Sequence, residues 1–545
     1  MSVKKNQIIP LKIESISSDG AGVGRFEGQA IFVPGTAVGD EANVRIVKDC
    51  KRYAFGIVQD WTHQSADHIQ PDCPVCGPCG GCCFRHLSYD AELRAKQDMV
   101  TDAFARLGGI DLSCLPILPS PQEERYRNKA QFPVQRAEDG QIRAGFYAAR
   151  SHRVVPCEDC RLQPFLLNQI AQRVCQLMQQ WDIEPYDEEQ HTGLIRHIFL
   201  RCGAHSGQVM LCLVANGRSL PHQTEFCDAL MQEFSELRTI ILNINTQRTN
   251  VITGKESLTL AGPGFIEDTL CHVPVTLGPL SFYQVNTLGA EHLYEVAAQF
   301  AQLTGNEVLL DLYCGTGTIG LSMAQNCRQL IGVEIIEEAV VTARSTAQAM
   351  GLKDARFLCA DAGQAAAQLA AEGLHPDVIV LDPPRKGCSQ ETLEAVVQMA
   401  PQRVVMVSCN PATAARDTHI LETLGYHAQQ VQPVDMFPRT RHVETVVLLS
   451  KLQNAEHHIE VDLNLDEMDL TSAESKATYS EIQDYVKEHT GLQVSHLYIA
   501  QVKRKNGIIE RLNYNLPKSE NSRVPQCPPE KEEAITEALR YFQMI

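Results

Sequence analysis

The feature that most constrains the fold is a repeated order of strand, glycine turn and helix between residues 306 and 450. It opens with "NEVLLDLYCGTGTIGLSMA" and closes with "ETVVLLS". Short apolar runs that alternate with helical segments are typical of a parallel sheet, because parallel strands need a crossover helix between them. The sequence therefore predicts an α/β domain built on a doubly wound, Rossmann-like sheet.

The glycine turn predicts a bound nucleotide-like ligand. Gly315, Gly317 and Gly320 lie between a strand and a helix, where glycines allow a ligand to approach the backbone at the helix N-terminus. Glu334 ends the next strand and can accept hydrogen bonds from a ribose. A nicotinamide enzyme would show the same pattern. The strand end "DVIVLDPPRKG", with Asp382 before two prolines, instead resembles class I S-adenosylmethionine-dependent methyltransferases that act on bases or amides.

Two further residues suggest reaction chemistry. Cys409 ends the apolar strand of "VVMVSCNPATAARD" and can be a small core residue, a metal ligand or a nucleophile. Glu444 enters a final apolar strand, which is costly unless the carboxylate pairs with Arg439 or Arg441 or is used in a reaction. A thiol, a carboxylate and a methyl donor together indicate methylation of an unreactive carbon.

The chain contains 20 cysteines, and several of them form a dense cluster. Without an export signal these cysteines are expected to be buried thiols, metal or cluster ligands, or catalytic groups and not disulfides. The segment "CPVCGPCGGCCFRH" predicts a soft-metal site, for which zinc and an iron–sulfur cluster both remain possible. Its cysteines are Cys73, Cys76, Cys79, Cys82 and Cys83, and Cys157 or Cys160 could supply a distant ligand.

The rest of the chain predicts three further regions. Residues 1–62 read as short strands broken by turns, which is typical of a small oligonucleotide-binding-type barrel. Residues 63–285 form a central α+β domain that carries the cysteine loop, and residues 286–452 form the Rossmann-like domain. Residues 453–545 begin with an acidic linker and continue with one or two helices, either a nucleic-acid-binding module or a solubilising appendage.

The net charge of −18 is weak evidence against a nucleic-acid partner, because phosphate is bound by local patches. Basic clusters occur in "KDCKRYAFG", "ERYRNKAQF" and "QVKRKNGIIER". The first two interleave cations with aromatic residues, which is the arrangement expected for stacking on unpaired bases. The absence of a signal peptide and of a long apolar run predicts a cytoplasmic protein without a membrane span.

The ordered motifs resemble the RNA (uracil-5-)-methyltransferases, and most of all the bacterial 23S ribosomal RNA type with an N-terminal TRAM barrel and a four-iron cluster. The resemblance extends from about Ile8 to Ser450. Its motifs are "SDGAGVGR", "CGGC", "YRNKAQFPV", "SFYQVN", "LLDLYCGTGTIGL", "GVEI", "LDPPRKG", "VSCNPATAARD" and "RHVETVVLL".

The resemblance implies a mechanism and a set of site residues. Cys409 would add to carbon 6 of uracil and make carbon 5 nucleophilic, and Glu444 would then remove the carbon-5 proton. The methyl donor would be S-adenosylmethionine, and the substrate a uridine of 23S ribosomal RNA. A monomer is expected. The implied donor contacts are Gln284, Tyr313, Glu334 and Asp382.

The resemblance also implies a [4Fe-4S] cluster held by Cys73, Cys79, Cys82 and Cys160. Cys76 and Cys157 depart from the family pattern and compete with these ligands. Three other functions remain open at this stage. They are a transfer-RNA uracil methyltransferase, a non-catalytic iron–sulfur RNA-binding protein, and an amide methyltransferase that would leave Cys409 and Glu444 without a role.

Overall fold

The computed structural model describes residues 3–148, 151–248, 251–451, 479–490, 492, 494–505 and 527–541. The chain divides into two compact units, Met1–Ala455 and Glu456–Ile545. The finer division of the first unit at residues 62 and 285 stays a prediction. Across the described ranges, no helix has both the length and the apolar character needed to cross a membrane.

The N-terminal strands form a six-stranded sheet in the order β1-β5-β6-β4-β3-β2. Alternate residues of each strand point inward, so Ile9, Ile31, Val44 and Ile46 make a small apolar core. This agrees with the prediction of a small β-rich domain. The strands are β1 (Ile8–Lys12), β2 (Ser15–Ile16), β3 (Gly22–Phe26), β4 (Gln29–Val33), β5 (Glu41–Asp49) and β6 (Tyr53–His63).

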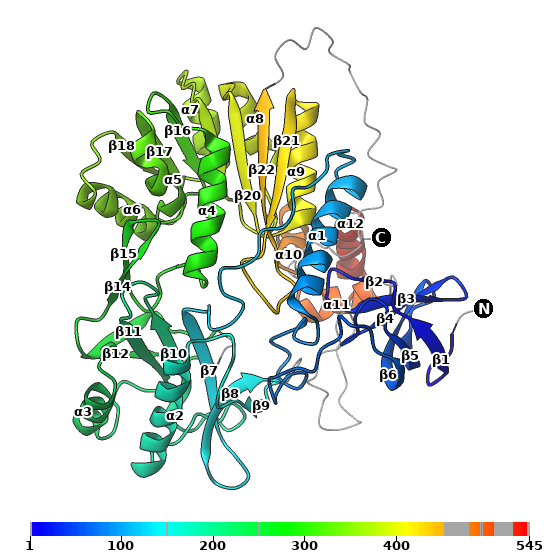
Figure 1. Cartoon of the computed structure of the whole chain (residues 1–545), viewed down its shortest axis with the longest axis vertical. Helices are drawn as coiled ribbons and strands as arrows, with labels where there is room; N and C mark the ends of the chain where they lie inside the picture. Colours follow the sequence, from blue (N-terminus) through cyan, green and yellow to red (C-terminus); the bar gives the residue numbers. More distant parts are fainter. Residues whose placement is uncertain are drawn as a thin grey trace. The chain divides into compact units, whose positions relative to one another are not determined.

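The central region contains a seven-stranded mixed sheet in the order β13-β12-β11-β10-β7-β8-β9. The helices α2 (Phe165–Gln180) and α3 (Gln223–Glu233) pack on the sheet (Figure 1). The strands are β7 (Lys129–Arg136), β8 (Ile142–Tyr147), β9 (Val154–Pro156), β10 (Ile195–Cys202), β11 (Val209–Ala215), β12 (Leu237–Ile244) and β13 (Glu256–Ala261). A hairpin of β14 (Ile266–Leu270) and β15 (Val273–Leu277) follows.

The doubly wound sheet predicted from the sequence is confirmed. Its strand order is β18-β17-β16-β19-β20-β22-β21, in which the first five strands are parallel and β22 runs antiparallel to β20. The strands are β16 (Val308–Leu312), β17 (Gln329–Glu334), β18 (Ala355–Cys359), β19 (Val378–Leu381), β20 (Arg403–Ser408), β21 (Tyr426–Val434) and β22 (Glu444–Lys451). The helices are α4 (Thr287–Ala301), α5 (Thr318–Met323), α6 (Glu337–Ala349), α7 (Ala362–Ala371), α8 (Gln390–Met399) and α9 (Pro411–Thr423), and a 3-10 turn, η1 (Ala324–Asn326), follows α5.

Helix α1 (Tyr89–Arg106) precedes the central sheet in the sequence but packs on the doubly wound sheet. The Ser88 hydroxyl accepts a hydrogen bond from the Ala91 amide and starts the helix, and Gly109, at φ +60°, follows its end. Val100 and Phe104 of α1 share one apolar core with Ala415 of α9. A segment predicted to belong to the central domain therefore supports the Rossmann-like domain.

The second unit is a small helical bundle. Ile482, Ile499 and Ile535 are fully buried in its core, one from each helix. The helices are α10 (Tyr479–Thr490), α11 (His496–Lys505) and α12 (Pro529–Tyr541). The predicted acidic linker lies outside the described residues, and so do residues 506–511 of the predicted basic segment.

Candidate active site

The carboxyl ends of the parallel strands gather most of the predicted site residues. Ligands of such sheets bind at this edge, next to the point where the strand order reverses, which here lies between β16 and β19. In Figure 1 the arrow of β22 points away from the central sheet, so the carboxyl ends of the parallel strands face that sheet. The side chains at or just after these ends are Tyr313, Glu334, Asp382 and Cys409.

The antiparallel strand β22 brings Glu444 to the same edge. Ser408 at the end of β20 pairs with Thr445, so Cys409 and Glu444 lie next to each other where the two strands meet. Cys409 is partly exposed, whereas Glu444 is only 6% exposed. A thiol that solvent reaches beside a buried carboxylate is a suitable arrangement for a nucleophile and a base.

Burial controls the protonation of this site. Burial raises the pKa of Glu444 to about 8, and the nearby Asp382 adds to this shift while Arg385 opposes it. Burial also raises the pKa of Asp382 to about 7. The pKa of Cys409 is raised by burial and by the charges of Glu444 and Asp382. At pH 7 the free site therefore holds Glu444 mostly in its protonated form, and Glu444 can accept a proton only after it has ionised.

The glycine turn between β16 and α5 has the geometry that its sequence requires. Gly317 has φ +80° and begins α5, a backbone conformation that favours glycine. A side chain at Gly320 would come within 2.8 Å of Asp311 Oδ2, which accepts a hydrogen bond from the Gly320 amide at 2.9 Å. Glu334 Oε2 accepts a hydrogen bond from the Gly315 amide at 3.0 Å. The second strand end and the glycine turn therefore form one continuous binding edge.

Gln284 reaches this edge from the segment before α4. Its carbonyl accepts a hydrogen bond from Asn128 Nδ2 at 2.7 Å, which ties the segment to the central sheet. The buried hydroxyl of Tyr294 contacts Thr318 Oγ1 at 3.2 Å and also hydrogen-bonds with Gln284. The structure thus brings all four predicted donor contacts to one region, with α4 behind them.

Three residues at this edge were given no role by sequence reasoning. Asp311 is fully buried, and burial raises its pKa to about 8. Phe282, two residues before Gln284, is 73% exposed. Ile335, directly after Glu334, is 63% exposed. Exposed apolar and aromatic side chains can cover the face of a base. In the sequence, only their positions close to motif residues could have singled out Phe282 and Ile335.

The loop that leads into β22 is held by α1. Lys96 Nζ is fully buried and donates to Glu92 Oε1 and Asp435 Oδ1, each at 2.7 Å, and to the Phe437 carbonyl at 3.1 Å. Tyr89 donates to Asp435 Oδ2 at 2.8 Å. We call Tyr89, Glu92, Lys96 and Asp435, together with Arg439, the buried ion network. It fixes the chain a few residues before Glu444.

The alternative that Glu444 pairs with Arg439 or Arg441 is wrong. Arg439 instead bonds Glu123 Oε2 at 2.6 Å, and its guanidinium lies 3.6 Å from Glu92 Oε2. Arg441 pairs with Asp19. Among the described residues Glu444 has no ion pair, so its burial is not explained by a salt bridge.

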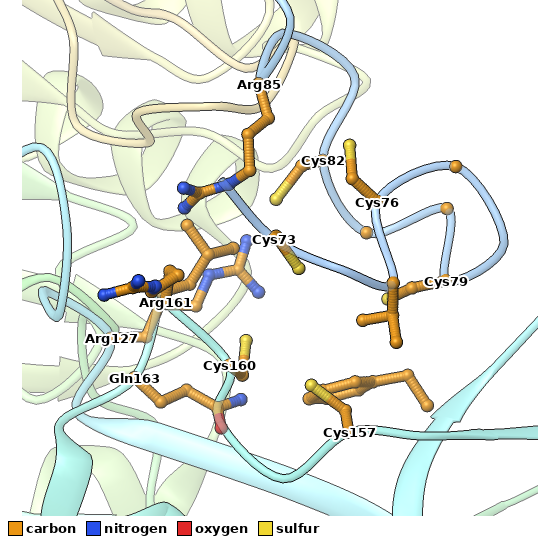
Figure 2. Close-up of a pocket in the computed structure, with 16 residues that line it drawn as sticks. Cys73, Cys76, Cys79, Cys82, Arg85, Arg127, Cys157, Cys160, Arg161 and Gln163 are labelled. Atoms are coloured by element: carbon orange, nitrogen blue, oxygen red, sulfur yellow. The ribbon is translucent and has the colours of Figure 1, made fainter. Parts of the chain in front are cut away.

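Six cysteines from two segments line one pocket. Figure 2 shows Cys73, Cys76, Cys79 and Cys82 of the loop before α1 around the same space as Cys157 and Cys160. A hydrogen bond between the latter two lowers the pKa of Cys160 to about 7 and raises that of Cys157. The structure thus brings the two cysteine groups together, and includes both competing cysteines.

Polar atoms without a partner face the same pocket. Three arginines and Gln163 lie on one side of it, away from Cys76 and Cys79 (Figure 2). Arg85 Nε and Nη2, Arg127 Nε and Gln163 Oε1 are buried and have no hydrogen-bond partner among the residues that the structure describes. In the ranges that the structure covers, no three Cys, His, Asp or Glu side chains form a group able to hold a single metal ion.

The two basic clusters with aromatic residues differ in exposure. Tyr53 and Phe55 on β6 are 41% and 37% exposed, and their rings lie 5.7 Å apart. Tyr126 and Phe132, by contrast, are buried, and the Tyr126 hydroxyl donates to the Pro438 carbonyl at 2.9 Å. The prediction of base stacking is therefore wrong for Tyr126 and Phe132, because the fold uses these rings in its interior.

Comparison with known proteins assigns the family. The profile of the tRNA (uracil-5-)-methyltransferase family matches residues 88–452, and that of the TRAM domain matches residues 2–58. An RNA methyltransferase of Halalkalibacterium halodurans is 41% identical over 82% of this chain and 98% of its own length. The chain belongs to this methyltransferase family. An RNA methyltransferase of Clostridium tetani is 40% identical over 82% of the chain and 97% of its own length.

A solved structure of the same kind supports the fold assignment. The crystal structure of the Pyrococcus abyssi tRNA (uracil-54, C5)-methyltransferase, in complex with S-adenosyl-L-homocysteine, matches with a TM-score of 0.65 and 25% identity. It covers 81% of this chain and 100% of the archaeal chain. The protein is thus an S-adenosylmethionine-dependent RNA methyltransferase with an N-terminal TRAM domain, as the sequence predicts.

Proposed function

We propose that this methyltransferase modifies carbon 5 of a uridine in 23S ribosomal RNA through a covalent adduct with Cys409. The observation that carries the proposal is the pairing of Ser408 with Thr445, which sets the thiol beside the buried carboxylate of Glu444. An uncharged uracil carbon reacts poorly with a sulfonium methyl group. A nucleophile and a base at one strand edge offer a way around this difficulty.

The proposed reaction balances as follows. The thiolate of Cys409 forms a bond to carbon 6 of uracil, and the electron pair moves to make an enolate that is nucleophilic at carbon 5. Carbon 5 bonds to the methyl group as the methyl–sulfur bond of S-adenosylmethionine breaks. Glu444 then removes the carbon-5 proton, and the carbon–sulfur bond to Cys409 breaks to give 5-methyluridine. With a pKa near 8, the ionised form of Glu444 has a high affinity for the carbon-5 proton, and the fraction of Glu444 in this form grows as pH rises towards 8.

The methyl donor is proposed to lie along the strand edge described above. Asp382 and Glu334 at the strand ends, with Gln284 and Tyr313 beside them, would hold it. Glu334 follows the second parallel strand, the usual position for an acidic residue that binds ribose in such sheets. A target base has to be unpaired or flipped to reach Cys409 at this edge.

The cysteine pocket is proposed to hold a [4Fe-4S] cluster through Cys73, Cys79, Cys82 and Cys160. The residues fit such a group in their chemistry, because these four cysteines line one pocket and thiolates are the usual ligands of iron–sulfur clusters. The unpartnered groups of Arg85 and Gln163 add polar contacts around the pocket. When bound, the cluster would link the loop before α1 to the central region through Cys160. No step of the methyl transfer depends on it.

Cluster ligands can be tested by iron and sulfide analysis of anaerobically purified protein. We expect about four irons per chain, with loss of the visible absorption band in C73S, C79S, C82S and C160S. C76S and C157S should retain iron. If C76S or C157S loses the iron while one of the proposed ligands is dispensable, the assignment is wrong.

Transfer RNA is the second candidate substrate. The matching family is described as tRNA (uracil-5-)-methyltransferase, and the similar archaeal structure is a transfer-RNA enzyme. The TRAM domain and the cysteine pocket favour ribosomal RNA. Trapping of a covalent adduct with each of the two RNAs decides between these substrates.

The deciding experiment uses 5-fluorouridine-substituted 23S ribosomal RNA and transfer RNA with S-adenosylmethionine. Fluorine cannot leave carbon 5 as a proton, so a true nucleophile is trapped as an adduct that survives a denaturing gel. We expect an adduct with ribosomal RNA that is absent in C409A. An adduct with transfer RNA alone would change the substrate. No adduct with either RNA would contradict the role of Cys409.

A further inference from the structure

Two cations at the start of β7 have no acidic partner. Arg127 and Lys129 are both half-buried, and within the described residues neither forms an ion pair with a carboxylate. Other cations nearby are paired, as Arg125 is with Asp159 and Arg136 is with Glu184. An uncompensated charge that is partly removed from water is unfavourable, so these two positions call for an explanation.

The residue that pairs with Lys129 across the sheet is also a cation. Lys129 lies opposite Arg201 in the ladder between β7 and β10. Arg201 is buried, and its guanidinium donates to the carbonyls of Gly278 and Ser281 and not to a carboxylate. Burial and the charges of Arg201 and Arg127 lower the pKa of Lys129. Arg127 also faces the cysteine pocket and favours the ionised form of Cys160, but within the described residues no carboxylate pairs with either cation.

The residue between these two cations is bonded to the segment that carries Gln284, a proposed donor contact. Asn128, the residue between them, donates to the carbonyl of Gln284 at 2.7 Å and to Thr287 Oγ1 at 3.0 Å. Its own amide donates to the Val285 carbonyl at 2.8 Å. Arg127 and Lys129 thus sit where the central sheet is attached to the donor-binding side of the active site.

Arg127 also lies near the entrance to β22. Burial lowers the pKa of His442, and Arg385 and Arg127 are among the cations that act in the same direction. His442 precedes Glu444 by two residues, and Arg385 acts on both Cys409 and Glu444. The Tyr126 hydroxyl donates to the Pro438 carbonyl at 2.9 Å, so the neighbouring Arg127 lies close to the segment that leads into β22.

We propose that Arg127 and Lys129 form a binding site for backbone phosphates of the RNA next to the target uridine. The chain as a whole has a charge of −18, so RNA must be held by local groups that carry no acidic neighbour. Arginine can bind a phosphate with two parallel hydrogen bonds, and lysine adds a flexible point charge. The inference rests on the proposed function, because it places the phosphates by reference to Cys409 and Glu444.

The test compares R127Q and K129Q with the charge-conserving R127K and K129R. The matched control is R136Q, since Arg136 lies on the same strand and already pairs with Glu184. Binding of 23S ribosomal RNA transcripts and of transfer RNA is measured by filter binding over a range of salt, with S-adenosylhomocysteine present. Turnover at saturating RNA and donor binding by calorimetry are measured in parallel.

We expect R127Q and K129Q each to weaken RNA binding about threefold to tenfold at low salt. Each should lower the slope of log affinity against log salt by about 0.7 to 0.9, the amount for one lost phosphate contact. R127K, K129R and R136Q should keep the wild-type slope. Donor affinity should not change, and turnover at saturating RNA should stay within about twofold, because phosphate contacts position the substrate.

Wild-type slopes in both R127Q and K129Q would overturn the proposal, as would lost turnover with unchanged binding. K129Q, with K129R as its control, carries the test if R127Q does not fold, since Arg127 also borders the cysteine pocket. A wild-type protein that forms no adduct with either RNA contradicts the proposed function itself. A wild-type protein that forms the adduct while K129Q binds RNA normally contradicts only this inference.

Discussion

Two groups of buried carboxylates in the first unit differ in their partners. Glu92 and Asp435, in the buried ion network, share the ammonium of fully buried Lys96. Asp382 and Glu444, at the strand edge, form no ion pair within the part of the chain that the structure describes, and burial raises the pKa of both. Burial raises the pKa of Glu92 as well, but its partner Lys96 opposes that shift. A buried pair supports structure, whereas a buried carboxylate that has no ion pair is available for a reaction.

The largest expected effect comes from replacing the unpaired Glu444. E444Q should lower the rate of methyl transfer by roughly 10²-fold to 10⁴-fold, the contribution of a positioned base. It should not lower the free energy of unfolding, because a neutral amide avoids the cost of burying a charge. Single-turnover kinetics and urea denaturation measure the two effects.

The reaction intermediate provides a control for E444Q. Because the adduct can form but its carbon-5 proton is not removed, E444Q should accumulate adduct with unmodified RNA. A rate within tenfold of wild type, or a large loss of stability, would remove the distinction between the two carboxylate groups.

The next largest effect is expected in the buried ion network. K96M leaves Glu92 and Asp435 buried without their shared cation and should lower the free energy of unfolding by about 3–5 kcal/mol. The matched control is K12M, because Lys12 pairs with Glu41 at 3.1 Å while its side chain is 66% exposed. That change should cost less than about 1 kcal/mol. Similar losses in both variants would show that burial does not set the value of these pairs.

A pH series tests the two carboxylates at the strand edge without mutation. The folded pKa values of Asp382 (about 7) and Glu444 (about 8) lie above the ordinary values near 4, so the folded state binds more protons between these limits. Their contribution should therefore lower stability as pH rises from about 4 to about 8, by at most about 1.4 kcal/mol per pH unit and group. E444Q should make this pH dependence shallower.

Methyl transfer should show the opposite trend in the upper part of this range. The base must be ionised to accept a proton, so the single-turnover rate should rise with pH until about 8. The raised pKa of Cys409 acts in the same direction. A rate that is constant between pH 6 and 8 would contradict the raised proton affinity of the unpaired group.

The smallest expected effect tests one hydrogen bond of the buried ion network. Y89F removes the bond from Tyr89 to Asp435 Oδ2 and leaves the Ser120 amide without its acceptor, at a cost of about 1.5 kcal/mol. The exposed counterpart is Y147F, which removes a 3.3 Å bond to Glu188 and should cost less than about 0.5 kcal/mol. Equal losses of unfolding free energy in Y89F and Y147F, measured by urea denaturation, would mean that the buried ion network tolerates the loss of one hydrogen bond.

Much of the fold could be predicted because its signals are local. Buried strands and glycine turns depend on residues a few positions apart, and the doubly wound sheet agrees with this pattern. The motif order likewise identified the family. The aromatic residues of "ERYRNKAQF" misled, because exposed and buried rings have the same local sequence.

By itself, the sequence determined the order of the elements and the residue types available at each strand end. Only the tertiary structure decided which charges are neutralised. Lys96 meets Asp435 across 339 positions because α1 packs beside β21, and Glu444 stays unpaired because Arg439 and Arg441 reach other acids. Ion pairing depends on the approach of distant segments within a few ångströms, which short-range sequence patterns do not encode.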